Sequence, residues 1–319
     1  MTGTAVAAGP AVAAGPAVAA AGPACPPSHP YPPPGHRAAL RRAHRAEVRW
    51  GRRAEVVGGR TPWQLAVPAA IAVGFLLLPL AGLLLRAPWP DLRRILAESG
   101  ALAALRLSLI TASAATALAV VLGVPLAWVL ARARFPGRSL LRALVTLPLV
   151  LPPVVGGVAL LFALGRRGFI GQYLDQWFGL TLPFTTAGVV VAETFVAMPF
   201  LIVTVEGALR TADLGLEEAA ATLGSGPLAT FRRVTLPLIA PSLIAGAVLC
   251  WARALGEFGA TITFAGNFPG VTQTMPLAVY QALERDPEAA VALSLVLLLV
   301  SVGVLALLRD RWLHPGAIP

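Results

Sequence analysis

The sequence predicts an all-α membrane protein with about six transmembrane helices. Hydrophobic residues make up 57% of the 319 residues and charged residues only 13%, about half the charged share of an ordinary soluble domain. A helix needs about 20 apolar residues to cross a hydrocarbon core of about 30 Å. Six segments reach that length, and they are residues 63–85, 103–130, 143–164, 184–208, 241–264 and 289–308.

The distribution of charge predicts the orientation of these helices. All 25 basic residues are arginines, of which seventeen fall on the side of the membrane that holds both termini and six in the loops on the other side. Because positively charged segments stay in the cytoplasm, both termini are predicted to be cytoplasmic in a multi-pass protein of the cell membrane. The pair Arg166 and Arg167 is a local exception. The net charge of +10 is therefore attributed to topology and the lipid bilayer, and no nucleic acid is expected as a partner.

The two ends of the chain differ from the apolar middle. Residues 1–35 repeat the unit AVAAGP and then become rich in proline, which predicts a disordered tail and not a signal peptide, because Pro or Gly interrupts each apolar run. Residues 36–62 form an Arg-rich cytoplasmic segment that suits an anionic membrane surface. The first transmembrane helix and an outer loop take residues 63–98, a core of five transmembrane helices takes 99–310, and a C-terminal tail takes 311–319.

A polar loop around residues 213–237 separates the fourth and fifth predicted spans. Its composition predicts a helix over 214–223, a glycine break, and a second short helix over 228–234. The loop is either a docking element for a partner or a plain connection between two spans. It carries a spaced pattern of a Glu-Ala-Ala triplet, a glycine, an aliphatic residue and a Leu-Pro pair, formed by Glu218, Ala219, Ala220, Gly224, Val234, Leu236 and Pro237.

This pattern resembles the cytoplasmic loop by which permease subunits of ABC importers dock onto their ATPase, with Val234 where that family most often has Ile. The resemblance implies a type I ABC importer permease fold with a cytoplasmic coupling helix. It also implies two cytoplasmic ATPase subunits that bind ATP and Mg, and no cofactor or metal in this chain. The chain has no GxxxxGK[ST] phosphate-binding loop, so it is expected to be a transporter subunit and not itself an enzyme.

Charged and small residues stand together near the end of the fifth predicted span. An ionisable side chain inside a bilayer costs at least about 2.5–3.5 kcal/mol, so Arg253 and Glu257 are candidates for a functional role. Four positions apart on one helix, they could pair, and they either take part in transport or only stabilise the bundle. Gly256 and Gly259 are interpreted as packing positions or as a flexible point for gating.

Further candidates for the translocation path and its gate lie nearby. Thr261 and Thr263 offer hydroxyls that could contact an oxyanion in transit, although such hydroxyls often bond to their own helix. Asn267 follows in the next loop. Pro152 and Pro153 interrupt the third span, which predicts either a broken helix or a simple kink.

The run from Arg253 to Ala260, with Gly266, Asn267 and the segment 272–276, resembles the permease subunits of molybdate importers, with sulfate and tungstate permeases as relatives. The resemblance implies a homodimer with the path at its interface and an extracytoplasmic molybdate-binding protein as partner. A sulfate or tungstate permease remains the alternative, and an ATP-independent carrier or scaffold is a more distant one. Glu193 and Arg106 are two further charges in predicted spans, and the sequence gives them no partner.

Overall fold

The computed structural model describes residues 63–313, which are helical with short connections and contain no strand. The predicted segments 1–35 and 36–62 lie outside the described residues, as does most of the predicted tail 311–319. The chain divides into two units after Ile71, and the packing below concerns the unit that begins at Ala72.

The helices are α2 (Trp63–Leu85), α3 (Leu92–Glu98), α4 (Ala101–Arg132), α5 (Arg138–Val150), α6 (Pro153–Leu164), α7 (Gly171–Phe178), α8 (Thr186–Thr211), α9 (Leu214–Thr222), α10 (Pro227–Thr230), the π-turn η1 (Phe231–Thr235), α11 (Leu236–Leu255), α12 (Gly259–Phe264), α13 (Met275–Arg285) and α14 (Pro287–Leu313).

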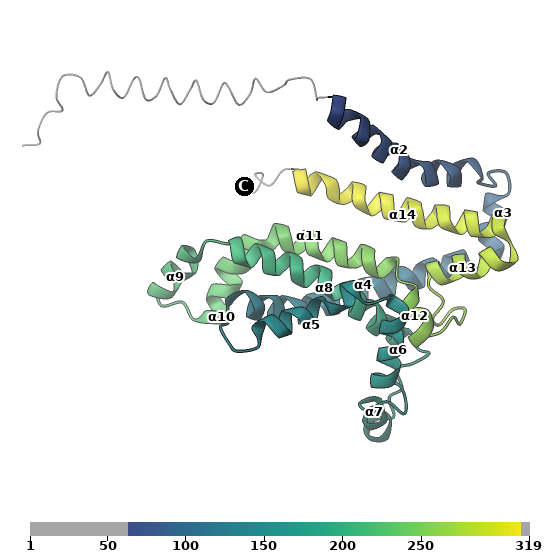
Figure 1. The fold of residues 1–319 in the computed structure, drawn as a ribbon. Helices are drawn as coiled ribbons and strands as arrows, with labels where there is room; N and C mark the ends of the chain where they lie inside the picture. Colours follow the sequence, from purple (N-terminus) through teal and green to yellow (C-terminus); the bar gives the residue numbers. More distant parts are fainter. Residues whose placement is uncertain (1–62, 314–319) are drawn as a thin grey trace, which may run out of the picture. The chain divides into compact units, whose positions relative to one another are not determined.

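The number of spans agrees with the prediction. Five helices are long and apolar enough to cross a membrane, and the bent pair α5 and α6 makes a sixth if it counts as one span. In Figure 1, α9 and α10 lie at one end of α8 and α11, whereas α12 and α13 lie at the opposite end. We refer to these as the α9 end and the α12 end.

The third predicted span is broken. Helix α5 ends at Val150, α6 begins at Pro153, and the two axes differ by 119°, so that α6 runs across the direction of α5 (Figure 1). Proline at the first position of a helix has no N–H to leave unsatisfied and a φ angle suited to the start of a helix. Pro152 and Pro153 therefore end one helix and begin another, as in the broken-helix alternative of the prediction.

The prediction for the fifth span and for the short helix before it is wrong in two respects. The segment 228–234 is not a separate helix, because α10, η1 and α11 form one continuous helix from Pro227 to Leu255. The span predicted at 241–264 also stops early, at Leu255, and a short separate helix, α12, follows at Gly259. A π-turn is rare but occurs mostly as a single turn inside an α-helix, and η1 is such a turn, through which the helix continues without ending.

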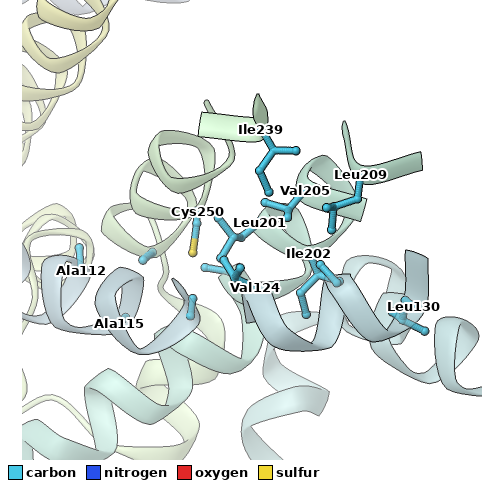
Figure 2. Packing of buried hydrophobic residues seen from close by; sticks show 14 of the residues in the cluster. Ala112, Ala115, Val124, Leu130, Leu201, Ile202, Val205, Leu209, Ile239 and Cys250 are labelled. Atoms are coloured by element: carbon cyan, nitrogen blue, oxygen red, sulfur yellow. The ribbon is translucent and has the colours of Figure 1, made fainter. Parts of the chain in front are cut away.

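The core of the bundle combines alanines with branched aliphatic residues. Helix α8 packs against both α4 and α11, and Ala112 and Ala115 of α4 are completely buried in the cluster that joins them (Figure 2). Ala119 of α4 is completely buried in the same cluster. A Cβ atom added at Gly123 would come within 3.2 Å of Ile202. Small residues allow helix backbones to approach closely in a membrane, where apolar burial alone gives little driving force.

Candidate functional site: a docking helix and two broken spans

Helix α9 is well defined at both ends. The Asp213 carboxylate accepts a hydrogen bond from Gly215 N at 2.8 Å and caps the first turn. At the other end Gly224 has a left-handed φ of 84°, and Ser225 N donates to the Ala220 carbonyl oxygen at 3.0 Å. A left-handed glycine is the usual way to end a helix. The helix predicted over 214–223 is therefore present.

The surface of α9 and the connection that follows it is exposed and partly apolar. Glu218 and Ala219 are exposed and Ala220 is half-buried. Leu223 is 88% exposed and Leu228 is 70% exposed. A cavity of about 440 Å³ lies between α9 and the start of the long helix that follows. Clustered apolar side chains at the surface commonly mark a site of protein contact.

Glu217 makes the contacts that the sequence did not reveal. Its Oε1 atom accepts a hydrogen bond from Arg132 Nη2 at 2.8 Å and from Thr235 Oγ1 at 3.1 Å. Arg132 is the last residue of α4 and Thr235 the last residue of η1. The sequence pattern pointed instead to the neighbouring Glu218. The sequence places Glu217 in the first turn of the helix, where a carboxylate is favourable, but it does not reveal the arginine partner, which is 85 positions away.

A second ion pair stands at the same end. Glu206 of α8 accepts hydrogen bonds from Arg142 of α5, with Arg142 Nε at 3.0 Å, and Arg210 Nη1 lies 3.9 Å from the same carboxylate. Arg138 Nε also donates to the Leu130 carbonyl oxygen at 2.8 Å, near the carboxyl end of α4. A cation there stabilises the negative end of the helix dipole. Arginines thus join α4, α5, α8 and α9 at the α9 end.

Arg253 and Glu257 do pair, although not on one helix. Arg253 Nη1 lies 2.6 Å from Glu257 Oε2. Glu257 Oε1 accepts a hydrogen bond from Ala260 N at 2.8 Å, and the glutamate is only 1% exposed. Because α11 ends at Leu255, this carboxylate lies in the break and links α11 to the first turn of α12.

Glycines bring α12 against α6. A Cβ atom at Gly157 would lie 1.7 Å from Thr263 Oγ1 and 2.8 Å from the Ala260 carbonyl oxygen, and one at Gly259 would lie 2.9 Å from the Pro153 Cβ. Only glycine fits at these two positions without displacing backbone or side chains. The halves of the two broken spans therefore contact each other through backbone and small side chains.

The remaining gate candidates have different environments. Gly256 has room, since the nearest atom to an added Cβ would be the Ala252 carbonyl oxygen at 3.6 Å. Thr263 Oγ1 donates to the Gly259 carbonyl oxygen of its own helix at 2.9 Å, the alternative that hydroxyls in spans often take. The Thr261 hydroxyl is buried and has no hydrogen-bond partner among the described residues.

The structure gives Glu193 a partner and Arg106 none. Thr111 Oγ1 donates to Glu193 Oε1 at 2.9 Å, between α4 and α8. Arg106 is exposed and forms no ion pair with the residues of the described part of the chain. Asn267 Nδ2 donates to Gln281 Oε1 at 3.4 Å, and its own Oδ1 has no partner within residues 63–313. Asn267 lies in the loop after α12, and no described contact joins it to Thr261.

The fold and the sequence together define the class of protein. Residues 119–318 match the family described as binding-protein-dependent transport system inner membrane component, and the chain belongs to this family. It is a multi-pass inner membrane permease subunit of a transport system. In a solved bacterial ABC transporter that imports alginate, a chain superposes with a TM-score of 0.63 at 17% identity, over 80% of this chain and 95% of that chain. The MetNI methionine transporter gives 0.51 at 20% identity, over 65% and 94%, and these similarities establish the type I importer permease fold.

The relatives of higher sequence identity are permeases of molybdenum and sulfate transport systems. The molybdenum transport system permease protein ModB of Mycobacterium tuberculosis is 50% identical over 243 residues, which are 76% of this chain and 92% of the relative. ModB of Escherichia coli K12 is 44% identical over 210 residues, 66% of this chain and 92% of the relative. The sulfate transport system permease protein CysT of Salmonella typhimurium is 39% identical over 234 residues, 72% and 84% of the two chains.

Proposed function

We propose that this chain is the permease subunit of an ATP-driven importer of molybdate. The observation that carries the proposal is the 50% identity to a molybdenum permease over 92% of that relative, compared with 39% to a sulfate permease. Sulfate and tungstate are tetrahedral dianions like molybdate, so a permease for either remains the second candidate. Uptake measurements with molybdate, tungstate and sulfate distinguish these candidates.

In this proposal, the ATPase docks on α9. Glu218, Ala219 and Ala220 lie on that helix and Leu223 projects beyond it, which supports contact with a partner. Val234 of η1 and Leu236, the first residue of α11, are half-buried and position the loop, whereas Pro237 is exposed. The ATPase holds ATP and Mg, and its closing moves α9. The α9 end is then cytoplasmic, as the arginine distribution predicts.

The proposal also assigns a role to the α12 end. Two copies of the chain form a homodimer, and an extracytoplasmic molybdate-binding protein delivers the anion to a path between them. Exposed apolar side chains on α5 and α6, such as Val150 and Phe162, are suited to lipid or to the second copy. The break at Gly256 and the Arg253–Glu257 pair then lie where the path opens and closes. Such a path needs to attract the dianion without binding it tightly.

The test is molybdate uptake into vesicles that contain this chain, its ATPase and its binding protein. We expect uptake only when ATP is present on the side of the membrane that holds the ATPase. Tungstate should inhibit this uptake, and excess sulfate should have little effect on it. A matched control carries an ATPase that binds but cannot hydrolyse ATP. Sulfate as the better substrate would move the assignment to the sulfate permeases. Uptake without any ATPase would favour a carrier and contradict the proposal.

A further inference from the structure

We propose that Glu217 is a positioning residue that fixes the docking helix α9 to two spans, α4 and α11, and so transmits the movement of α9 to both. The inference rests on the proposed function in one respect, namely that the ATPase docks on α9. It assigns a role to a side chain next to the Glu-Ala-Ala triplet and not part of it.

The contacts of Glu217 are short and largely shielded from water. One carboxylate oxygen, Oε1, accepts from Arg132 at 2.8 Å and from Thr235 at 3.1 Å. The side chains of Arg132 and Glu217 are 14% and 19% exposed, and Thr235 is 1% exposed. A hydrogen bond between charged groups is stronger than a neutral one, and shielding from water strengthens it further.

The two partners of Glu217 are placed so that they connect it directly to the spans. Arg132 is the last residue of α4, a helix of 32 residues that packs along α8. Thr235 ends the π-turn and is followed at once by the first residue of α11. A displacement of α9 therefore pulls on the end of α4 and on the continuous helix from Pro227 to Leu255 at the point where α11 begins, and not only on the chain segments that precede and follow α9.

Little else holds α9 in place. None of its residues is buried, and within the described part of the chain Glu217 is the α9 residue that forms an ion pair with another helix. Hydrophobic packing therefore contributes little to the position of α9. The hydrogen bonds of Glu217 to Arg132 and Thr235 hold α9 in place instead.

The adjacent Glu218 lacks these contacts. Both glutamates line the cavity beside α9, but the hydrogen bonds to Arg132 and Thr235 go to Glu217 alone. The side chain of Glu218 is exposed and makes no hydrogen bond with a described residue, which leaves it free for a partner. One glutamate is thus bound to the spans and the next is not.

The test compares Glu217→Gln with the exposed control Glu288→Gln in the complete transporter. We expect Glu217→Gln to retain the ATPase and to hydrolyse ATP, while molybdate uptake per ATP hydrolysed falls about tenfold, because an amide cannot form the ion pair. Amide hydrogen exchange in α9 should become about tenfold faster. Glu217→Asp and the exchanged pair Arg132→Glu with Glu217→Arg should recover part of the uptake per ATP.

Three results would overturn this role. They are unchanged uptake per ATP and unchanged exchange in Glu217→Gln, a loss of ATPase binding that accounts for the loss of uptake, and no recovery in either rescue variant. If Glu217→Gln fails to insert, Thr235→Val removes one of the two bonds at nearly constant volume and should give a smaller effect in the same direction. If the wild-type transporter takes up no molybdate, the proposed substrate is wrong. Faster amide exchange in α9 of Glu217→Gln would still support the link between α9 and the spans.

Discussion

At the α9 end, long charged side chains join the helices, whereas at the α12 end glycines bring the backbones themselves into contact. Arg132 reaches Glu217 and Arg142 reaches Glu206, in each case from one helix to another. At the α12 end, Gly157 leaves no room for even one additional carbon atom beside Thr263. The same chain therefore uses two kinds of contact along its length.

The difference has a physical consequence. Arginine and glutamate side chains have several rotatable bonds, so an ion pair between them can follow a modest movement of the two helices. A glycine contact has no such freedom, because backbone atoms already touch and small changes of volume are felt at once. We therefore expect the α9 end to be sensitive to charge, and the α12 end to be sensitive to size at its glycine contacts and to charge at the Arg253–Glu257 pair.

The largest effect is expected from Gly157→Val. The new side chain would collide with Thr263 Oγ1 and with the Ala260 carbonyl oxygen, and overpacking of this kind costs about 1–3 kcal/mol or more. The thermal unfolding midpoint of the purified protein should fall and uptake should be lost. Gly157→Ala and Gly207→Ala form a control pair of equal size, since one added carbon already collides at position 157 and nothing lies within 4 Å of it at position 207. A midpoint unchanged by Gly157→Val would disprove the close contact between α6 and α12.

Glu218→Arg should have the next largest effect, and only on coupling. This residue is exposed, so reversing its charge should leave insertion and thermal stability within about 0.5 kcal/mol of wild type. Co-purification of the ATPase and ATP-dependent uptake should both fall strongly. Normal values of both in this variant would remove the docking role assigned to α9.

Glu257→Gln should give an intermediate loss of stability. The amide oxygen can still accept from Ala260 N, but Arg253 loses its ionic partner in an apolar setting. Loss of a charged hydrogen bond of this kind costs about 1.5–3 kcal/mol, and Arg253 is 27% exposed, which favours the lower part of that range. Denaturation of the detergent-solubilised protein measures the change. The double variant Arg253→Gln with Glu257→Gln should lose no more stability than Glu257→Gln alone, which would show that the pair acts as a unit. A loss equal to the sum of the two single losses would contradict the pairing.

The smallest effect is expected from removing residues 1–35. The Ala-, Gly- and Pro-rich composition of this segment predicts no core contacts. Membrane insertion and molybdate uptake should equal those of the full chain, as measured in the same vesicles. A deletion that prevents insertion would show that the segment directs the protein to the membrane.

Hydropathy alone located the spans because each needs a long apolar segment, but it could not locate the breaks within them. Pro152 and Pro153 did indicate the first break, since prolines interrupt helices. The second break, at Gly256 to Phe258, contains the charged Glu257, but the sequence did not show that the helix stops there, and a close contact between Gly259 and Pro153 accompanies the break. That contact joins residues far apart in the sequence, so no local pattern predicts it.

The functional residues divide in the same way. The spacing from Glu218 to Pro237 is local and was visible in the sequence. The roles of Glu217 and Glu193 depend on partners 85 and 82 positions away, and only the packing of α4 brings Arg132 and Thr111 to them. Long-range polar pairs are therefore the part of the site for which the three-dimensional structure was necessary.

The most direct test of the difference between the two ends compares Glu218→Arg and Glu257→Gln in the same transporter, measuring ATPase association and molybdate uptake together. We predict that Glu218→Arg loses both, whereas Glu257→Gln keeps the ATPase and its hydrolysis and loses uptake. Equal loss of ATPase association in the two variants would contradict the account, because it would show that the α9 end and the α12 end do not have separate roles.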